Sequence, residues 1–131
     1  FVKNSFSSSD RAMIRTTFVS PDKNPEYNDS EYRGSDPGKG TKDKVFLLST
    51  KEAVRYFGNK SVMCLNTKYA KARAKEQYGE DELSWWLRTP GKENDRAAVF
   101  RVDNDGWYID YHGGTIFYDY AVRPALWVDL D

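Results

Sequence analysis

The sequence has one cysteine, one histidine and no net charge, since Lys+Arg and Asp+Glu each total 20. Cys64 has no partner for an internal disulfide, which favours a bacterial protein or a reducing compartment over a disulfide-stapled scaffold. With His112 as the only histidine, a histidine-rich metal site is excluded. Because no global field attracts the chain to nucleic acid or to an anionic membrane, we expect no nucleic-acid partner.

Long apolar runs are also missing. No stretch approaches the about 20 apolar residues that a membrane helix needs, and the start of the chain does not resemble a signal peptide. We therefore expect no membrane span in this chain. The sequence begins at Phe1 without an initiator methionine and continues at once in packed-looking sequence, so we expect upstream sequence to be missing.

Aromatic residues, by contrast, are abundant. They make up 15% of the 131 residues, although the mean hydropathy is −0.80. This length suits one domain with a modest core. The combination of many rings with a polar chain predicts that rings serve both in the core and on an exposed contact surface.

The first half of the sequence predicts small helices, one strand and a long loop. The cap residues of 7–10 predict a helix over 11–15, with Met13 and Ile14 facing inward. Residues 20–43 are rich in Pro, Gly, Asp, Asn, Lys and Ser and predict a long surface loop, either functional or disordered. A buried strand is predicted over 45–48 from its continuous apolar character.

Two further helices and a sheet are predicted after that strand. Ser49 or Thr50 caps a helix over 51–57 that Gly58 ends, and a second helix spans 68–77. Apolar alternation over 97–102 and the Asn104-Asp105-Gly106 signal predict a hairpin, in which Trp107, Ile109 and Tyr111 share one face. A turn at Gly113-Gly114, a strand over 116–118 and a closing strand over 122–128 complete an α+β fold with a C-terminal antiparallel sheet and long loops.

A series of motifs along nearly the whole chain resembles a bacterial family of uncharacterised domains that is common in gut anaerobes. The residues that carry the resemblance, in order and spacing, are Phe6-Ser7, Asp43 to Ser49, Glu52-Ala53, Tyr56-Phe57, Thr67, Tyr69 to Ala72, Trp85 to Gly91, Ala98, Asp105-Gly106 and Val122 to Trp127. Members of that family have further N-terminal strands, so residues 1–131 are expected to form one domain that lacks them.

The resemblance implies a C-type-lectin-like fold, in the version shared with formylglycine-generating enzymes and the variable proteins of diversity-generating retroelements. It implies ligand binding at the bacterial cell surface or outside the cell, as part of a longer protein. All residues from Tyr108 to Tyr120 also belong to the set that adenine mutation of AAC codons produces in retroelement systems. Ordinary hairpin composition explains the same residues, so both interpretations stay open.

Catalytic and metal chemistry find little support in the sequence. A Cys64–His112 pair needs two distant residues to meet, and formylglycine-type oxidation needs a second cysteine. Asp103-Asn104-Asp105-Gly106 resembles the start of a calcium loop, but the downstream bidentate Glu is missing and a strand begins at once. We expect no enzyme activity, no cofactor and no bound metal.

The last third of the chain holds the candidate binding residues. Tyrosine-rich surfaces give large contact area at low entropic cost, and the same rings can stack on sugars. The predicted ligand-binding residues are Asn94, Trp107, Tyr108, Asp110, Tyr111, His112, Tyr118, Asp119 and Tyr120. Predicted structural residues, in the core or pinning loops, are Trp85, Trp86, Arg88, Arg123 and Trp127, with ligand carboxylate binding as the lesser alternative for the two arginines.

Two functions from different classes follow. The first is a non-enzymatic module that binds a protein or carbohydrate ligand at a cell surface, with its site on the hairpins between Lys92 and Tyr120. The second is a structural or adhesin domain of a larger bacterial surface protein, in which these rings pack against other strands. Exposure of the rings in the full-length domain distinguishes the two.

Overall fold

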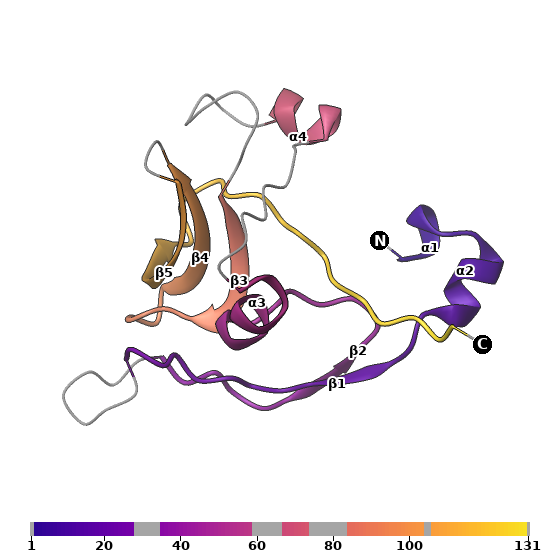
Figure 1. The fold of residues 1–131 in the computed structure, drawn as a ribbon, viewed down its shortest axis with the longest axis horizontal. Helices are drawn as coiled ribbons and strands as arrows, with labels where there is room; N and C mark the ends of the chain where they lie inside the picture. The colour runs from indigo at the N-terminus through magenta and orange to yellow at the C-terminus, as the bar shows by residue number, and fades with distance from the viewer. Residues whose placement is uncertain (1, 28–34, 59–66, 74–83, 104–105, 131) are drawn as a thin grey trace.

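The structure, a computed structural model, describes residues 2–27, 35–58, 67–73, 84–103 and 106–130. Helices and strands follow each other as in the α+β class (Figure 1). The elements are α1 (Val2–Ser5), α2 (Ser8–Met13), β1 (Thr17–Val19), β2 (Thr41–Asp43), α3 (Thr50–Phe57), α4 (Lys68–Arg73), β3 (Trp85–Pro90), β4 (Arg96–Asp103) and β5 (Gly106–Thr115).

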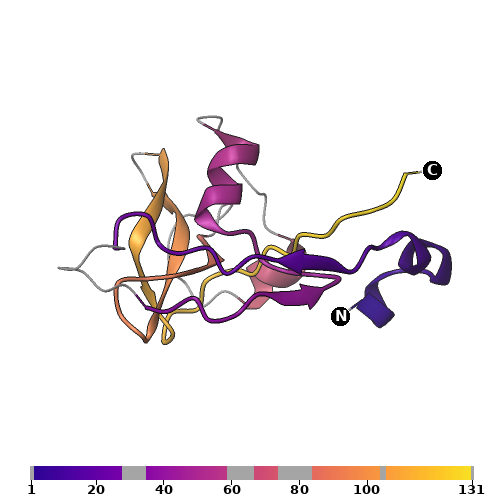
Figure 2. The same cartoon turned by 90° about the horizontal axis from the view of Figure 1, so that it is seen from below.

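Two antiparallel sheets lie at different ends of the molecule. β3, β4 and β5 form a three-stranded sheet in that order, and β1 pairs with β2 in a separate two-stranded ribbon. Figures 1 and 2 show the ribbon running from the three-stranded sheet toward α1 and α2, with the C-terminal segment returning to the same end. The predicted α+β class is therefore confirmed.

The core lies between α3 and the inner face of the three-stranded sheet. β3 alternates, with Trp85, Leu87 and Thr89 buried, because successive strand side chains point to opposite faces. Trp85 and Phe100 stack with ring centroids 4.8 Å apart. The core cluster consists of Leu48, Ala53, Trp85, Leu87, Ala98 and Phe100.

Helix α3 forms as its local sequence predicts. Ser49 is the N-cap, and its side chain and that of Glu52 form a reciprocal capping box. Gly58 is the C-cap, with φ of 55°, a value that favours glycine. Helix α2 also has a capping box, between Ser7 and Asp10, but it begins at Ser8, earlier than predicted.

Several local predictions need correction in the first half. Ile14 is buried as expected, but Met13 is exposed because α2 has no sheet beneath it. Residues 45–48 do not form the predicted strand: in this segment only Phe46 makes a β-bridge, to Ala125. The predicted loop over 20–43 contains β2. Of the helix predicted over 68–77, α4 covers Lys68–Arg73, and residues 74–77 lie outside the described residues.

The hairpin is present, but the chain after it differs from the prediction. Asp103 pairs with Gly106, and Asn104 and Asp105 lie outside the described residues. Gly113-Gly114 is not a turn, because β5 continues to Thr115. Gly113, with φ of 86°, lies instead in a β-bulge, where residues 111–113 of β5 lie opposite the single residue Ala98 of β4. The expected sharing of a face by Trp107, Ile109 and Tyr111 is interrupted by this bulge.

After β5, residues 116–130 form no further strand. Residues 116–118, predicted as a strand, form a turn in which the Tyr118 N–H donates to the Thr115 carbonyl at 3.0 Å. The predicted strand over 122–128 is instead a segment with single bridges to three different parts of the chain. The bridges join Ala121 to Trp85, Ala125 to Phe46, and Val128 to Ile14. The segment therefore ties separate parts of the chain together and does not close the sheet.

Candidate functional site

The outer face of the three-stranded sheet gathers aromatic and charged side chains. Trp86 pairs with Val99, and Val99 pairs with Asp110, so these three side chains share one face. Arg101 lies two residues beyond Val99 and pairs with Tyr108, which extends the same face. The rings of Tyr118 and Tyr120 cover this face. We use the name outer-face cluster for six of its residues: Trp86, Arg101, Tyr108, Asp110, Tyr118 and Tyr120.

Tyr120 is the central ring of the outer-face cluster. Its ring meets Trp86 edge-on with centroids 4.9 Å apart and stacks with Tyr118 at 5.5 Å. It also covers Gly114, where an added Cβ would approach the Tyr120 ring to 2.4 Å. A side chain at position 114 would displace Tyr120, so glycine is required here for the close approach of the ring.

A charged pair supports these rings. The Arg101 Nε donates to the Asp110 carboxylate at 2.7 Å, and the guanidinium lies over the Tyr120 ring at 5.5 Å from its centroid. Burial lowers the pKa of Arg101, but the hydrogen bond to Asp110 and the nearby Tyr120 raise it more, so the pKa is raised overall. The cation is thus held between a carboxylate and a ring face.

The rings that reach solvent lie at the rim of this face. Tyr108 is 45% exposed and Tyr118 is 50% exposed, whereas Tyr120 is half-buried. Asp119, also predicted as a ligand-binding residue, is exposed between Tyr118 and Tyr120. Sequence reasoning missed Ile116 and Phe117, which are 69% and 85% exposed in the adjoining turn. In the sequence they are marked only as two apolar residues between glycines and tyrosines, a pattern that predicts a strand.

His112, another predicted binding residue, lies in a second group with Tyr27, Lys92 and Arg96. Its ring meets Tyr27 edge-on at 6.1 Å, and the Lys92 ammonium lies 5.8 Å from the Tyr27 centroid. Arg96 Nη1 lies 3.3 Å from His112 Nδ1, a bond in which the ring nitrogen accepts. Asn94 is exposed in the loop between β3 and β4. The structure therefore divides the predicted site into two groups.

Tyr111 lies beside an anchor that sequence reasoning missed. Asn24 is only 2% exposed, and its side-chain amide donates to the carbonyls of Pro90 at 2.9 Å and Tyr111 at 2.7 Å. Burial raises the pKa of the Tyr111 phenol above 10.0, and the negative charge of Glu26 raises it further. An Asn-Pro-Glu segment in a polar loop is compatible with an Asx turn, which Asn24 forms with the Glu26 N–H.

Arg88 of β3 contacts several other segments of the chain. Its guanidinium donates to the Leu47 carbonyl at 2.9 Å and the Ser20 carbonyl at 3.2 Å. It also pairs with the carboxylates of Asp22 and Glu52. Ser49 adds a 2.7 Å bond to Asp22, so the loop before β2, the start of α3 and β3 meet at one arginine.

The remaining predicted structural residues have three different environments. Trp85 is buried in the core, whereas Trp127 is 46% exposed and meets Tyr56 edge-on at 6.1 Å. The Arg123 guanidinium lies 5.1 Å from the Phe57 centroid and 5.2 Å from that of Trp85. Cys64 and the side chain of Trp107 lie outside the described residues, so neither the cysteine–histidine pair nor Trp107 is placed.

In the described part of the chain, no three side chains among His, Cys, Asp and Glu lie close enough together to hold a metal ion. None of the helices in the described ranges is both long and apolar enough to cross a membrane.

The chain matches one family over almost its whole length. Residues 1–130 match a domain of unknown function, DUF6273, and the chain belongs to that family. No curated protein and no solved structure shows a significant match to it. The expected membership of an uncharacterised domain family is thus confirmed, and the family itself assigns no activity.

Proposed function

We propose that this member of the DUF6273 family is a non-enzymatic ligand-binding module whose outer-face cluster contacts a protein or a carbohydrate. The observation that carries the proposal is the fixed stack of Tyr118 on Tyr120, which Trp86 and Arg101 hold from two further directions. Rings already held in place lose little conformational entropy when a ligand covers them. Half-exposed Tyr108 and Tyr118 then offer contact area on the same face as the Arg101–Asp110 pair.

Both ligand classes fit the chemistry of this face. Tyrosine and arginine are among the residues that contribute most binding energy in protein interfaces, and exposed Ile116 and Phe117 add apolar area beside them. A sugar would stack on the open ring of Tyr118 and use the charged pair for its hydroxyl groups. We therefore propose the site and leave protein and glycan as two arms of one test.

The finer parts of the proposal concern fold family and setting. We propose a C-type-lectin-like fold, a location at the bacterial surface or outside the cell within a longer protein, and diversification of 108–120 by a retroelement. The support is the motif resemblance and the residue types of that segment, which supplies four of the six cluster residues. Sequencing sibling isolates tests diversification, because substitutions confined to adenine positions support it and uniform scatter contradicts it.

Binding arrays test the module itself. The intact chain is applied to glycan and cell-surface protein arrays, with calcium or chelator, beside a Tyr108→Ala/Tyr118→Ala/Tyr120→Ala variant. Tyr69→Ala is the matched control, because Tyr69 is exposed on α4. We expect at least one hit that the triple variant loses by about tenfold or more and the control retains. A folded triple variant that keeps every hit would contradict the proposal.

The alternative is a structural or adhesin domain, favoured by the 85% exposure of Phe117 and 69% exposure of Ile116. Apolar side chains this exposed in one turn are typical of a surface that another segment covers. Tyrosine iodination of the full-length protein distinguishes the two functions. Modification of Tyr108 and Tyr118 indicates an open binding face, and their protection in the absence of ligand indicates a structural interface.

A further inference from the structure

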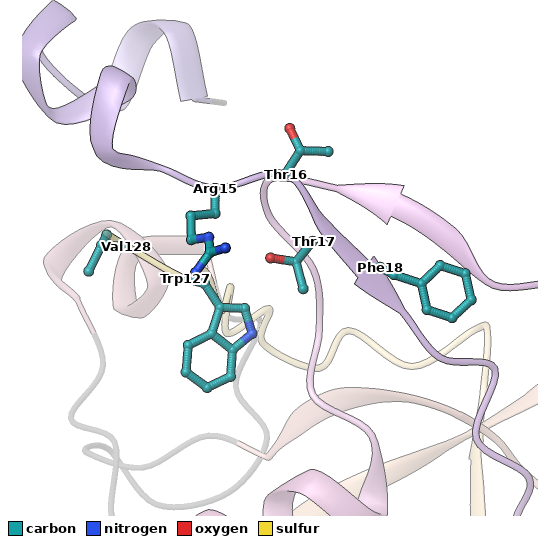
Figure 3. Close-up of a pocket in the computed structure, with 6 residues that line it drawn as sticks. All are labelled: Arg15, Thr16, Thr17, Phe18, Trp127 and Val128. Atoms are coloured by element: carbon teal, nitrogen blue, oxygen red, sulfur yellow. The ribbon is translucent and has the colours of Figure 1, made fainter. Parts of the chain in front are cut away.

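A pocket lies at the end of the molecule away from the three-stranded sheet. It has a volume of about 390 Å³ and is lined by Arg15, Thr16, Thr17, Phe18, Trp127 and Val128. Figure 3 shows the side chains of Arg15 and Thr17 pointing toward Trp127, while Thr16 and Phe18 point away, as alternation along an extended chain requires. The volume is within the range of small-ligand sites, near its lower end.

Two backbone hydrogen bonds and one ring contact hold the walls of this pocket. The Arg15 N–H donates to the Trp127 carbonyl at 2.9 Å, and the Asp129 N–H donates to the Met13 carbonyl at 3.0 Å. Tyr56 of α3 meets the Trp127 indole edge-on and supports it from the side. The pocket is therefore formed before any ligand enters, which reduces the entropic cost of binding.

The lining combines a flat apolar surface with one cation. Trp127 supplies a half-exposed indole, Thr17 supplies a hydroxyl, and Arg15 supplies the only charge among the lining residues. Asp129 forms an ion pair with Arg15, with 3.1 Å between Oδ1 and Nη1, but the two side chains are 55% and 60% exposed, so solvent weakens this pair. A guanidinium has five N–H donors, and several remain for a second anion.

We propose that this pocket binds a small ring compound that carries a carboxylate. The ring lies against the Trp127 indole, the carboxylate takes the free donors of Arg15, and Thr17 adds one hydrogen bond. Planar two-point recognition of carboxylates is a property of arginine that lysine lacks. A sugar acid and an aromatic acid share this chemistry, and the pocket is independent of the outer-face cluster.

Titration followed by NMR tests the proposal on the intact chain. The reporter is the ¹⁵N–H signal of the Trp127 indole, assigned by its loss in Trp127→Phe. Glucuronate and benzoate are the two acidic probes, and glucose and benzyl alcohol are their neutral counterparts. We expect saturable shifts with one or both acids, and which acid binds identifies the kind of ring.

Three variants separate recognition from general charge effects. Arg15→Met should weaken acid binding by about tenfold or more, since a charge-assisted hydrogen bond is lost. Asp129→Asn should strengthen it by about two- to fivefold, because a competitor for Arg15 is removed. Lys23→Met removes an equal charge from an exposed site that does not line the pocket and should leave binding unchanged. Unfolding curves check that each variant is folded.

Three results would overturn the proposal. They are the absence of saturable shifts with either acid, equal affinity for the acids and their neutral counterparts, and unchanged binding in a folded Arg15→Met variant. None of them bears on the outer-face cluster, whose array test uses other residues.

Discussion

Arg88 and Arg123 lie in similar sequence contexts, shortly before Pro90 and Pro124, yet their surroundings are opposite. The Arg88 guanidinium binds two backbone carbonyls and two carboxylates. The guanidinium of Arg123 lies against two aromatic rings, and its buried Nη1 has no hydrogen-bond partner among the described residues. One arginine organises polar segments, and the other fills an aromatic site at the cost of an unsatisfied donor.

This difference shows that the local sequence fixes where each arginine lies, whereas segments distant in the sequence supply the groups that its guanidinium contacts. Asp22 and Glu52 are separated from Arg88 by 66 and 36 positions in the sequence. The loop before β2 and the start of α3 bring these carboxylates to Arg88. Arg123 instead meets Phe57 and Trp85, which belong to the core around α3 and β3.

Removing Arg88 should produce the largest effect. Arg88→Met leaves the carboxylates of Asp22 and Glu52 partly buried without their cation, and breaking such a pair costs about 3 kcal/mol of the free energy of unfolding. Urea unfolding followed by circular dichroism measures the loss. A change below about 0.5 kcal/mol would show that polar partners are not what distinguishes this arginine.

Asn24 tests whether the loop around Asp22 has an anchor besides Arg88. Asn24→Ala removes two hydrogen bonds to partly buried carbonyls and should cost about 2 kcal/mol of the free energy of unfolding. Hydrogen exchange of the loop amides should accelerate in the same variant. Unchanged exchange would mean that Arg88 alone holds the loop.

Glu52→Gln sharpens the comparison by changing charge and keeping shape. With its oxygen in the place of Oε2, the amide still accepts from the Ser49 N–H and from Arg88 Nη1, now without the negative charge. Its NH2 group then takes the place of Oε1, where it faces the Arg88 Nη2 donor, so that second hydrogen bond is lost. We expect a loss of about 1 kcal/mol in the free energy of unfolding, smaller than that of Arg88→Met. Asp22→Asn is the matched control at the second carboxylate, and equal losses would show that the two anions share the guanidinium.

Arg123→Met should have the smallest effect. The variant loses two cation–π contacts but also removes the buried unsatisfied Nη1, and a Met side chain fills the same space. We expect a change within about 1 kcal/mol, of either sign, in thermal or urea unfolding. A loss as large as that of Arg88→Met would contradict the contrast between the two arginines.

The site was predictable to different degrees in its two parts. Alternation along 97–102 and the hairpin signal led to the strands that present Tyr108 and Asp110, and their pairing with Arg101 follows from register. The grouping of Tyr118 and Tyr120 with Trp86 was not predictable, since it depends on a turn at 116–118 and on Gly114 leaving room for a ring. The division of His112 from this group follows from the bulge in β5.

The elements with local causes could be read from the sequence alone. Capping boxes at Ser7 and Ser49, the C-cap at Gly58 and apolar alternation over 97–102 act over a few residues, so they can be found without a structure. The partners of Arg88 and Arg123, the burial of Asn24 and the path of 121–128 along three separate segments depend on tertiary packing. Those contacts join residues far apart in the chain, and which of them form depends on how all segments pack at once.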